Sequence, residues 1–384
     1  MAGVGVLVLF VKGFIVQQLT LGLASFCTWV ERKGSALIQD RVGANRAGAF
    51  FEVGDLLKTD NVLLQPIAFV VRTLVLAPTL ALVRFLGVLG VINTLLNDAL
   101  KALLKEDFIP EGTSPFLHAM GPFMAVAPVF LAYAVVPLAP DFVVAGYTIR
   151  PQVVELNAGL LFLLAMGSLA VYGVILAGLT GNNKFSLLGA LRASAQMISY
   201  ELAMGTTFAT LVLVYGSLDL YEIVMAQAGS VMNWGILHGT GIVSFIILFV
   251  VGMAETKRGP FDMPESESEL VAGYFTEYSG MKFLLFWLGE FAEIALFSLI
   301  LTIFFFGGWH IPFVSLPEGV WWAALVGHAV LIGKVLFFCV LQIVIRWTLP
   351  RFRYDQLMDL GWKILLPLSL VNLVVAAVIE LSLK

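Results

Sequence analysis

The sequence predicts an all-α, polytopic membrane protein with about eight transmembrane helices, on three observations. Hydrophobic residues make up 60% of the 384 positions and charged residues only 12%, about half the charged fraction of a soluble protein. Eight apolar runs are long enough to cross a bilayer, and the loops that join them alternate in positive charge. The formal net charge of −4 offers no basic surface for nucleic acid.

The eight apolar runs are the predicted spans. A membrane helix needs about 20 mostly apolar residues, and each run must be helical because lipid offers no hydrogen-bond partner to free backbone groups. The predicted spans lie at about 4–29, 116–139, 157–179, 198–216, 238–254, 283–306, 321–345 and 363–381, within a single membrane domain that covers 1–384.

Lys and Arg concentrate in the loops after the first, third, fifth and seventh spans. Because cytoplasmic loops carry the excess of positive charge, these four loops are predicted to be cytoplasmic, at 30–115, 180–197, 255–282 and 346–362. Both termini are then expected outside. The first run contains only Lys12 and lacks a cleavage site of small residues, so it is expected to remain as a span.

Residues 62–96 stand apart from the eight spans. They are apolar enough to enter a bilayer, yet they include Arg72 and Arg84. A single crossing here would reverse the charge pattern of every later loop, and two crossings with a turn would not fit. The segment is therefore expected to be an interfacial or re-entrant helical insertion on the cytoplasmic side.

Cysteine and histidine usage predicts that the chain holds no metal or bound cofactor. Cys27 and Cys339 lie more than three hundred residues apart, so no C-x-x-C pair exists for an iron–sulfur cluster or zinc. The four histidines lack metal-ligand spacing, and no phosphate-binding loop is present.

The densest polar cluster follows the fifth span. Residues 255–269 include five carboxylates, and the cluster runs directly into an apolar segment. In one interpretation it is a solvated helix start, with Asp262 as the cap. The apolar segment that follows and the positions of Asp262, Glu265 and Glu269 on one helical side weigh against this interpretation. In the other, crowding at the edge of lipid raises the pKa values of these carboxyl groups, which titrate as a coupled set suited to proton handling.

Three further acids, Glu201, Glu290 and Glu293, lie inside predicted spans. An ionised carboxylate at membrane depth costs at least about 2.5 kcal/mol, so it normally faces a polar cavity or a partner. A hydrated path and interhelical pairing with Arg or Lys are both compatible with this pattern. The loop after the first span, 31–46, mixes charges beside the membrane and could hold topology, dock a soluble partner or line a pocket for a polar head group.

Four motifs resemble one known family. The segment ETKRGPFDMPESESELVAGYFTEYSGMK at 255–282 closely resembles the third cytoplasmic loop of the H subunit of bacterial NADH:quinone oxidoreductase, the respiratory complex I. Similar matches are ERKGSALIQDRVGANRAG at 31–48, LKEDFIPEG at 104–112 and GNNKFSLLGALRASAQMISYE at 181–201. Their order and spacing agree over essentially the whole chain.

The resemblance implies a role in quinone reduction. The family forms a long cavity with peripheral-arm subunits, in which a quinone substrate approaches an iron–sulfur cluster of a neighbour. It implies that the clusters and the flavin belong to partner subunits, that this chain is not catalytic alone, and that lipids and small membrane-arm subunits surround it. It also implies a bacterial inner (plasma) membrane location, with periplasmic termini.

By the same resemblance, individual residues acquire expected roles. Those that would line or frame the quinone cavity are Arg32, Gln39, Arg41 and Arg46. Those that would carry protonation changes towards the membrane arm are Glu201, Glu255, Asp262, Glu265, Glu267, Glu269, Glu277 and Glu290.

The sequence departs from the family at two places. The usual G-P-N-R is Gly43-Ala44-Asn45-Arg46, which loses the rigid turn of proline. The family's L-Q-P and A-D-x-x-K adjoin on one helix, whereas here Leu64-Gln65-Pro66 and Asn97-Asp98-Ala99-Leu100-Lys101 are far apart. Either an insertion splits the helix, or Asp55-Leu56-Leu57-Lys58 replaces the second motif.

Two other functions fit parts of the sequence. A related membrane subunit of an energy-converting hydrogenase, or of a ferredoxin- or deazaflavin-fed quinone reductase, would share the bundle and the acidic loop. A stand-alone proton-coupled transporter would use the acids inside the spans, but such folds commonly have repeated halves, and 1–190 and 191–384 show no similarity.

Overall fold

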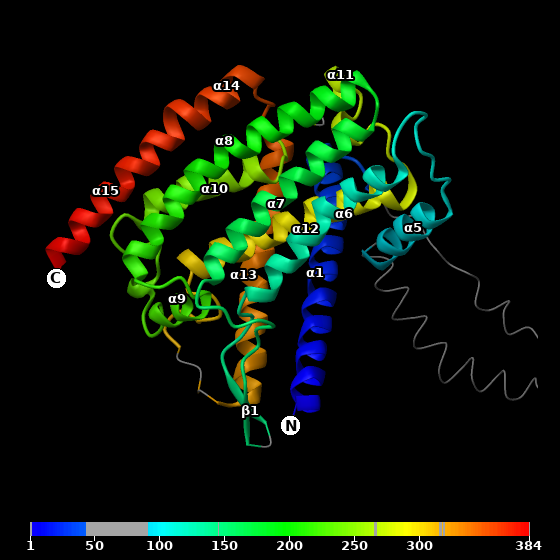
Figure 1. The fold of residues 1–384 in the computed structure, drawn as a ribbon. Coiled ribbons are helices and arrows are strands. Elements are labelled where there is room, and N and C mark those ends of the chain that lie inside the picture. The colour runs from blue at the N-terminus through cyan, green and yellow to red at the C-terminus, as the bar shows by residue number, and fades with distance from the viewer. Residues whose placement is uncertain are drawn as a thin grey trace, which may run out of the picture.

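The computed structural model describes residues 2–43, 91–144, 146–264, 267–314, 317 and 319–383. Within them, long helices form a tilted bundle (Figure 1). The helices are α1 (Ala2–Ile38), α5 (Val91–Leu104), α6 (Pro115–Ala132), α7 (Gly159–Thr180), α8 (Lys184–Tyr215), α9 (Leu220–Ala226), α10 (Gly241–Glu255), α11 (Glu267–Leu270), α12 (Gly280–Phe305), α13 (Trp321–Thr348), α14 (Tyr354–Asp359) and α15 (Leu366–Leu383).

Shorter elements join these helices. Three are 3₁₀ turns, at Tyr133–Val135, Val231–Asn233 and Gly273–Phe275, and a π-helical turn, Leu360–Leu365, connects α14 to α15. The strands β1 (Phe142–Val144) and β2 (Tyr147–Ile149) form a small antiparallel hairpin beyond the bundle. This hairpin is an addition to the predicted all-α architecture.

The described residues contain seven helices long and apolar enough to span a membrane. The predicted fold class, an all-α polytopic membrane protein, is confirmed. The fifth predicted span, 238–254, falls on α10, which has only 15 residues and is about 22 Å long. It is shorter than a typical hydrocarbon core of about 30 Å, because the chain before Gly241 forms turns.

Helix α12 lies at the centre of the bundle. It packs against α1, α5, α6, α10 and α13, and 78% of its most apolar window is buried, compared with 22% for α1 and for the last span. Glycines allow the closest helix approaches: a Cβ at Gly173 would lie 2.3 Å from the backbone nitrogen of Ala125. Helix α12 therefore contacts protein over most of its surface, whereas α1 and α15 present most of their surface outwards.

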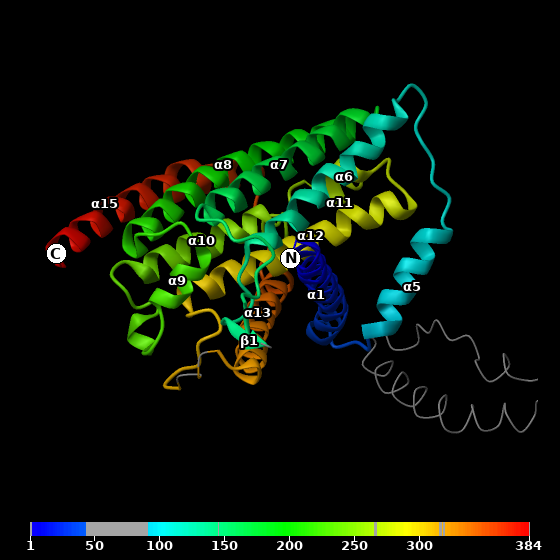
Figure 2. The same ribbon diagram turned by 60° about the horizontal axis from the view of Figure 1, so that its bottom comes forward.

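The cytoplasmic insertion is predicted at 62–96, and its residues 62–90 lie outside the described part of the chain. Its last residues begin α5, which stands at the edge of the bundle beside α1 and α12 (Figure 2). Of the two family motifs, Leu64-Gln65-Pro66 is not described, and Asn97 to Lys101 lie on α5.

The two cysteines meet inside the bundle although they are far apart in sequence. Cys27 on α1 and Cys339 on α13 are both fully buried, and the thiol of Cys339 donates a hydrogen bond to Ser298 of α12 at 3.3 Å. Both are free. They lie where the first and seventh predicted spans are in contact.

Candidate functional site

An apolar groove opens between α1, α5 and α12. Its volume is about 450 Å³, within the usual range for small-molecule sites. The α1 wall is mostly small and polar, and the α12 wall is apolar and aromatic. The lining residues are Gln18, Leu21, Gly22, Ser25, Thr28, Asp98, Ala99, Leu284, Trp287, Leu288 and Phe291.

One ion pair closes the rim of this groove. Arg32, on the last turns of α1, donates a hydrogen bond of 2.7 Å to Asp98 of α5. Its guanidinium carbon lies 5.3 Å from the ring centroid of Trp287. The predicted loop after the first span thus begins later than expected, because α1 continues to Ile38 and carries Arg32 on a rigid helix.

A buried arginine connects the groove to a cluster of ion pairs. The guanidinium carbon of Arg258 lies 4.4 Å from the ring centroid of Phe291, which lines the groove. Its Nη2 donates to Glu290 at 3.0 Å and its Nη1 to Glu31 at 3.4 Å. The side chains of Arg258 and Glu290 are only 5% and 4% exposed, so these charges interact at low dielectric.

Both acids have a second partner. Tyr274 donates from its hydroxyl to Glu290 at 2.8 Å, and Arg346 of α13 donates to Glu31. A cavity of about 10 Å³ lies among Glu31, Arg258 and Arg346, close to the size that holds one water molecule. We call Glu31, Arg258, Tyr274, Glu290 and Arg346 the buried ion cluster.

A second buried set lies next to this cluster. Lys257 Nζ is 3.9 Å from a carboxylate oxygen of Glu293, and Glu255 is 5% exposed. A cavity of about 40 Å³ borders both Glu255 and Glu293, which is room for water beside two acids. Glu201 is held nearby by a hydrogen bond from Ser168 of α7.

Asp262 is a loop acid whose protonation is shifted by its surroundings. Arg351 donates to it at 2.9 Å, but the carboxylate is largely removed from water. Burial raises the pKa of Asp262 from 3.8 to about 6, against the opposing effect of Arg351. This carboxyl group therefore changes charge near neutral pH.

The structure corrects the predicted helix start at Asp262. Residues 261–264 form turns, and α11 begins only at Glu267 and has four residues. Asp262 and Glu269 consequently do not share one helical face. Phe352 donates its backbone N–H to Pro260, so contacts with the chain after α13 hold this segment in place of helical hydrogen bonds.

The remaining predicted residues are dispersed. Gln39 and Arg41 lie beyond α1, where they are exposed and hydrogen-bonded to each other at 2.7 Å. Glu269 is 53% exposed and pairs with Arg192 at 2.6 Å, and Glu277 accepts a hydrogen bond from Asn183 at 2.7 Å. Arg46 and Glu265 lie outside the described residues, and only the backbone of Glu267 is described.

Sequence reasoning missed several residues of the site. Glu31, Arg258, Tyr274 and Arg346 were not assigned roles, and neither was Asp98 at the groove rim. A weak signal existed for Glu31, which directly precedes Arg32 on the continuous helix. For Tyr274 there was none, because its contact with Glu290 depends on how the chain folds back between α11 and α12.

Fold and site together define a multi-pass membrane protein whose buried ion cluster adjoins an apolar groove. A family model described as NADH dehydrogenase matches residues 83–377. The chain is 42% identical to an H subunit, numbered 1, of the NADH-quinone oxidoreductase of Geobacter metallireducens, over 94% of this chain and 93% of that protein. It is 38% identical to the H subunit of the same oxidoreductase from Thermomicrobium roseum, over 98% of this chain and 96% of that protein. The chain belongs to the family of NADH-quinone oxidoreductase H subunits, and the resemblance predicted from the motifs is confirmed.

Proposed function

We propose that this chain is the quinone-binding and proton-coupling membrane subunit of a proton-translocating NADH:quinone oxidoreductase. Its relatives are named as subunits of that oxidoreductase complex. The proposal has two parts, a site for the quinone and a route by which its reduction acts on protons.

The groove suits a quinone. A quinone has a flat ring that prefers aromatic and apolar walls, such as Trp287 and Phe291, and carbonyl oxygens that accept hydrogen bonds. Arg32 lies at the rim and can donate to such an oxygen when its pair with Asp98 opens. The groove also lies between helices, where an apolar molecule can enter from lipid.

The proposed coupling rests on one observation: Arg258 contacts both the apolar groove and the acids of the buried ion cluster. This arginine stacks on Phe291, a wall of the groove, and holds Glu290 and Glu31 on its other side. Reduction of a quinone to a quinol takes up two electrons and two protons, so the groove carries negative charge from the time the electrons arrive until the protons follow. A change in the field there alters the preference of the buried carboxylates for a proton.

The route continues from the buried ion cluster into the membrane. Lys257 is next to Arg258 in the chain and pairs with Glu293, which lies on α12 with Glu290. Glu255 and Glu293 border a cavity with room for water, and the charge of Glu201 acts on Glu255. Asp262, with its pKa of about 6, is close enough to Glu290 and Arg258 to interact with their charges. The exposed acid Glu269 and the half-buried Glu277, with Glu265 and Glu267, form the approach to this route from the aqueous side.

The complex supplies what this chain lacks. Electrons would come from an iron–sulfur cluster of a peripheral-arm subunit, and the flavin would belong to a more distant partner. Small membrane-arm subunits and lipids would cover the outward faces of α1 and α15. We place the protein in a bacterial inner membrane, with loops 30–115, 180–197, 255–282 and 346–362 in the cytoplasm and both termini outside.

Two alternatives have less support. A membrane component of an energy-converting hydrogenase would account for the acidic loop, but the relatives described above are named for NADH and quinone. Interhelical pairing for packing alone accounts for Glu290 with Arg258, but it does not account for the stacking of Arg258 on a groove wall.

The test is Glu290→Gln in the complete complex reconstituted into liposomes. Glutamine keeps a hydrogen-bond acceptor for Arg258 and removes the proton-binding carboxylate. We expect the rate of NADH oxidation with quinone and the rate of proton uptake to fall together, by roughly 10²-fold as for loss of a positioned proton-transfer group.

Glu380→Gln is the matched control, because Glu380 is also a partly buried acid on a predicted span and lies far from the groove near the C-terminus. It should leave both rates close to those of the native complex. Native rates of both reactions in a fully assembled Glu290→Gln complex would reject the coupling role.

A further inference from the structure

Helix α13 has an exposed face that runs along its whole length. Its exposed side chains recur at every third or fourth position, which places them on one side of the helix. The large residues of this face are Trp322, Val326, Phe337, Val340, Val344 and Trp347. We call this face the outer stripe.

The polar side chains of α13 turn away from the outer stripe. Lys334 donates to three carbonyls at the end of α12, and Gln342 donates to Ser298 of the same helix. Arg346 donates to Glu31 of α1. The structure describes every residue of α13, and none of those on the outer stripe is charged. Lipid imposes this arrangement, because it offers no partner to a polar group.

Tryptophans mark both ends of the outer stripe. Trp322 is 47% exposed and Trp347 is 37% exposed. They lie about 37 Å apart along the helix, and the hydrocarbon core of a bilayer is about 30 Å thick. Both rings can therefore reach a membrane interface, which is where tryptophan is enriched.

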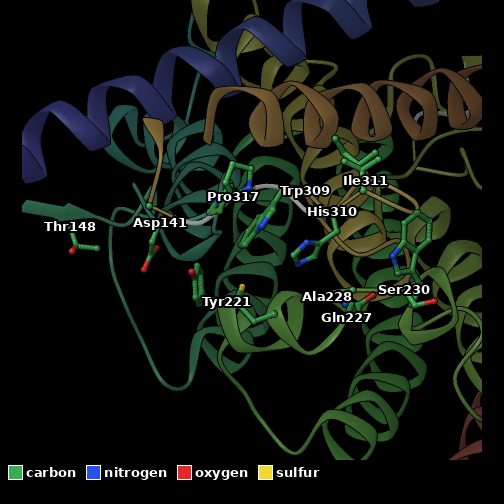
Figure 3. A pocket seen from close by; sticks show the side chains of 16 residues that line it. Asp141, Thr148, Tyr221, Gln227, Ala228, Ser230, Trp309, His310, Ile311 and Pro317 are labelled. Atoms are coloured by element: carbon green, nitrogen blue, oxygen red, sulfur yellow. The ribbon is translucent and has the colours of Figure 1, made fainter. Parts of the chain in front are cut away.

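The tryptophans near the start of α13 differ in burial. A pocket of about 450 Å³ lies between α9, the hairpin and the chain before α13. Figure 3 shows Trp309 and His310 inside it. Trp309 is 1% exposed, whereas Trp321 and Trp322 are 59% and 47% exposed and do not line the pocket. Trp309 thus completes the packing of the protein, and the exposed pair faces a medium outside the described chain.

The outer stripe is poorly shaped for a second transmembrane helix. Helices associate in membranes through small residues that let the backbones approach, and their ridges must fit opposing grooves. The small residues of the stripe are Ala329 and Gly333, and a Cβ at Gly333 would meet no described atom within 4 Å. Phe337, one turn further on, is 63% exposed. Flexible acyl chains can fill a surface of this shape, whereas a rigid helix needs a matching one.

From these features we propose that the outer stripe of α13 contacts lipid in the assembled complex. The side of the chain that carries α13 is then an outer edge of the membrane arm and not a junction with another subunit. This proposal concerns the assembly and is independent of the ligand that the apolar groove binds.

The test places a photoreactive residue on the outer stripe, as Phe337→benzoylphenylalanine, in the complete complex in nanodiscs of phosphatidylethanolamine and phosphatidylglycerol. On irradiation its ketone forms a bond with the nearest C–H group, and the mass of this chain is then measured. We expect the chain to gain the mass of one phospholipid. Phe338→benzoylphenylalanine is the matched control, because Phe338 is 3% exposed and packs on Phe306, with ring centroids 5.0 Å apart. It should be joined within the chain and gain no lipid.

Two further positions complete the test. Val340→benzoylphenylalanine lies one turn along the same stripe and should also gain a lipid, even if the Phe337 variant does not assemble. Ala329→benzoylphenylalanine tests the notch at Gly333. Attachment of any of these three outer-stripe variants to another subunit, or to another part of this chain, would overturn the proposal. Absence of lipid adducts at both Phe337 and Val340 would also overturn it.

Discussion

Two parts of the loop 255–282, the segment from Glu255 to Pro264 and the acid Glu269, lie in opposite environments. From Glu255 to Pro264 almost every residue is buried, and its charges meet partners from α1, α12 and the chain after α13. Glu269, a few residues further on, reaches the surface and is 53% exposed, although Tyr274 and Tyr278 beyond it are buried again. The same residue types therefore differ in what they can do, because low dielectric makes a buried charge sensitive to its neighbours and water screens an exposed one.

The largest effect expected from this difference is that of Arg258→Leu. Among the described residues, this change leaves Glu290 with Tyr274 as its hydrogen-bond partner and Glu31 with Arg346. Breaking a buried pair from one side costs about 3–5 kcal/mol. We expect a marked fall in the heat-inactivation midpoint of the complex and in the fraction assembled, measured on native gels.

Arg353→Leu is the control for this change, because Arg353 pairs with Asp355 at 2.7 Å while both side chains are more than half exposed. The double change of Arg258 and Glu290 to Leu should recover stability, since an apolar pair can replace a buried ion pair, but it should not recover proton uptake. If Arg258→Leu is as stable as Arg353→Leu, burial does not make the ion cluster more important to stability than an exposed pair.

An intermediate effect is expected at Asp262 and depends on pH. Burial raises the pKa of Asp262 from 3.8 to about 6, so the folded protein binds this proton more readily than the unfolded chain does. The stabilisation that results is complete at low pH and is lost as pH rises through about 6, where the ionised form costs about 3 kcal/mol. Asp262→Asn cannot titrate, so its stability relative to the native complex should increase from about pH 5 to about pH 7.5.

Heat-inactivation midpoints of both complexes across this pH range measure the effect of Asp262. Asp355→Asn provides the exposed counterpart, because Asp355 is held by Arg353 in water; its difference from the native complex should not rise with pH above about 5. If the midpoints of the native complex and of Asp262→Asn differ by the same amount at every pH, the carboxylate of Asp262 is solvated.

The fold could be predicted from the sequence because its signals are local. Apolar length and loop charge are read along the chain, and each predicted span falls on a helix. The ends of the helices were less predictable than the helices themselves. Helix α1 continues past residue 29 to Ile38, because no helix-breaking proline occurs in the polar stretch 30–38. The short α10 was also not foreseen, since apolar composition extends into turns before Gly241.

The site could be predicted only in part because its contacts are distant in sequence. Arg258 meets Glu31 from the first span and Glu290 from the sixth, and no spacing rule connects them. The number of acids in the loop was visible, but which of them is buried depends on the helices that cover it. Asp262 was placed at a helix start from its local chemistry, and that prediction was wrong because tertiary contacts determine the turn.

The smallest effect is expected from Glu269→Gln, and it tests the exposed acid of the loop directly. Glu269 is close to Arg192, at 2.6 Å, but the two side chains are 53% and 24% exposed. Exposed pairs of this kind contribute at most about 1 kcal/mol. The complex should keep its stability and lose less than about twofold in proton uptake, measured in liposomes beside Glu290→Gln. A loss as large as that of Glu290→Gln would mean that a partner subunit covers Glu269 and removes it from water. Glu269 and the segment from Glu255 to Pro264 would then form one continuous buried route.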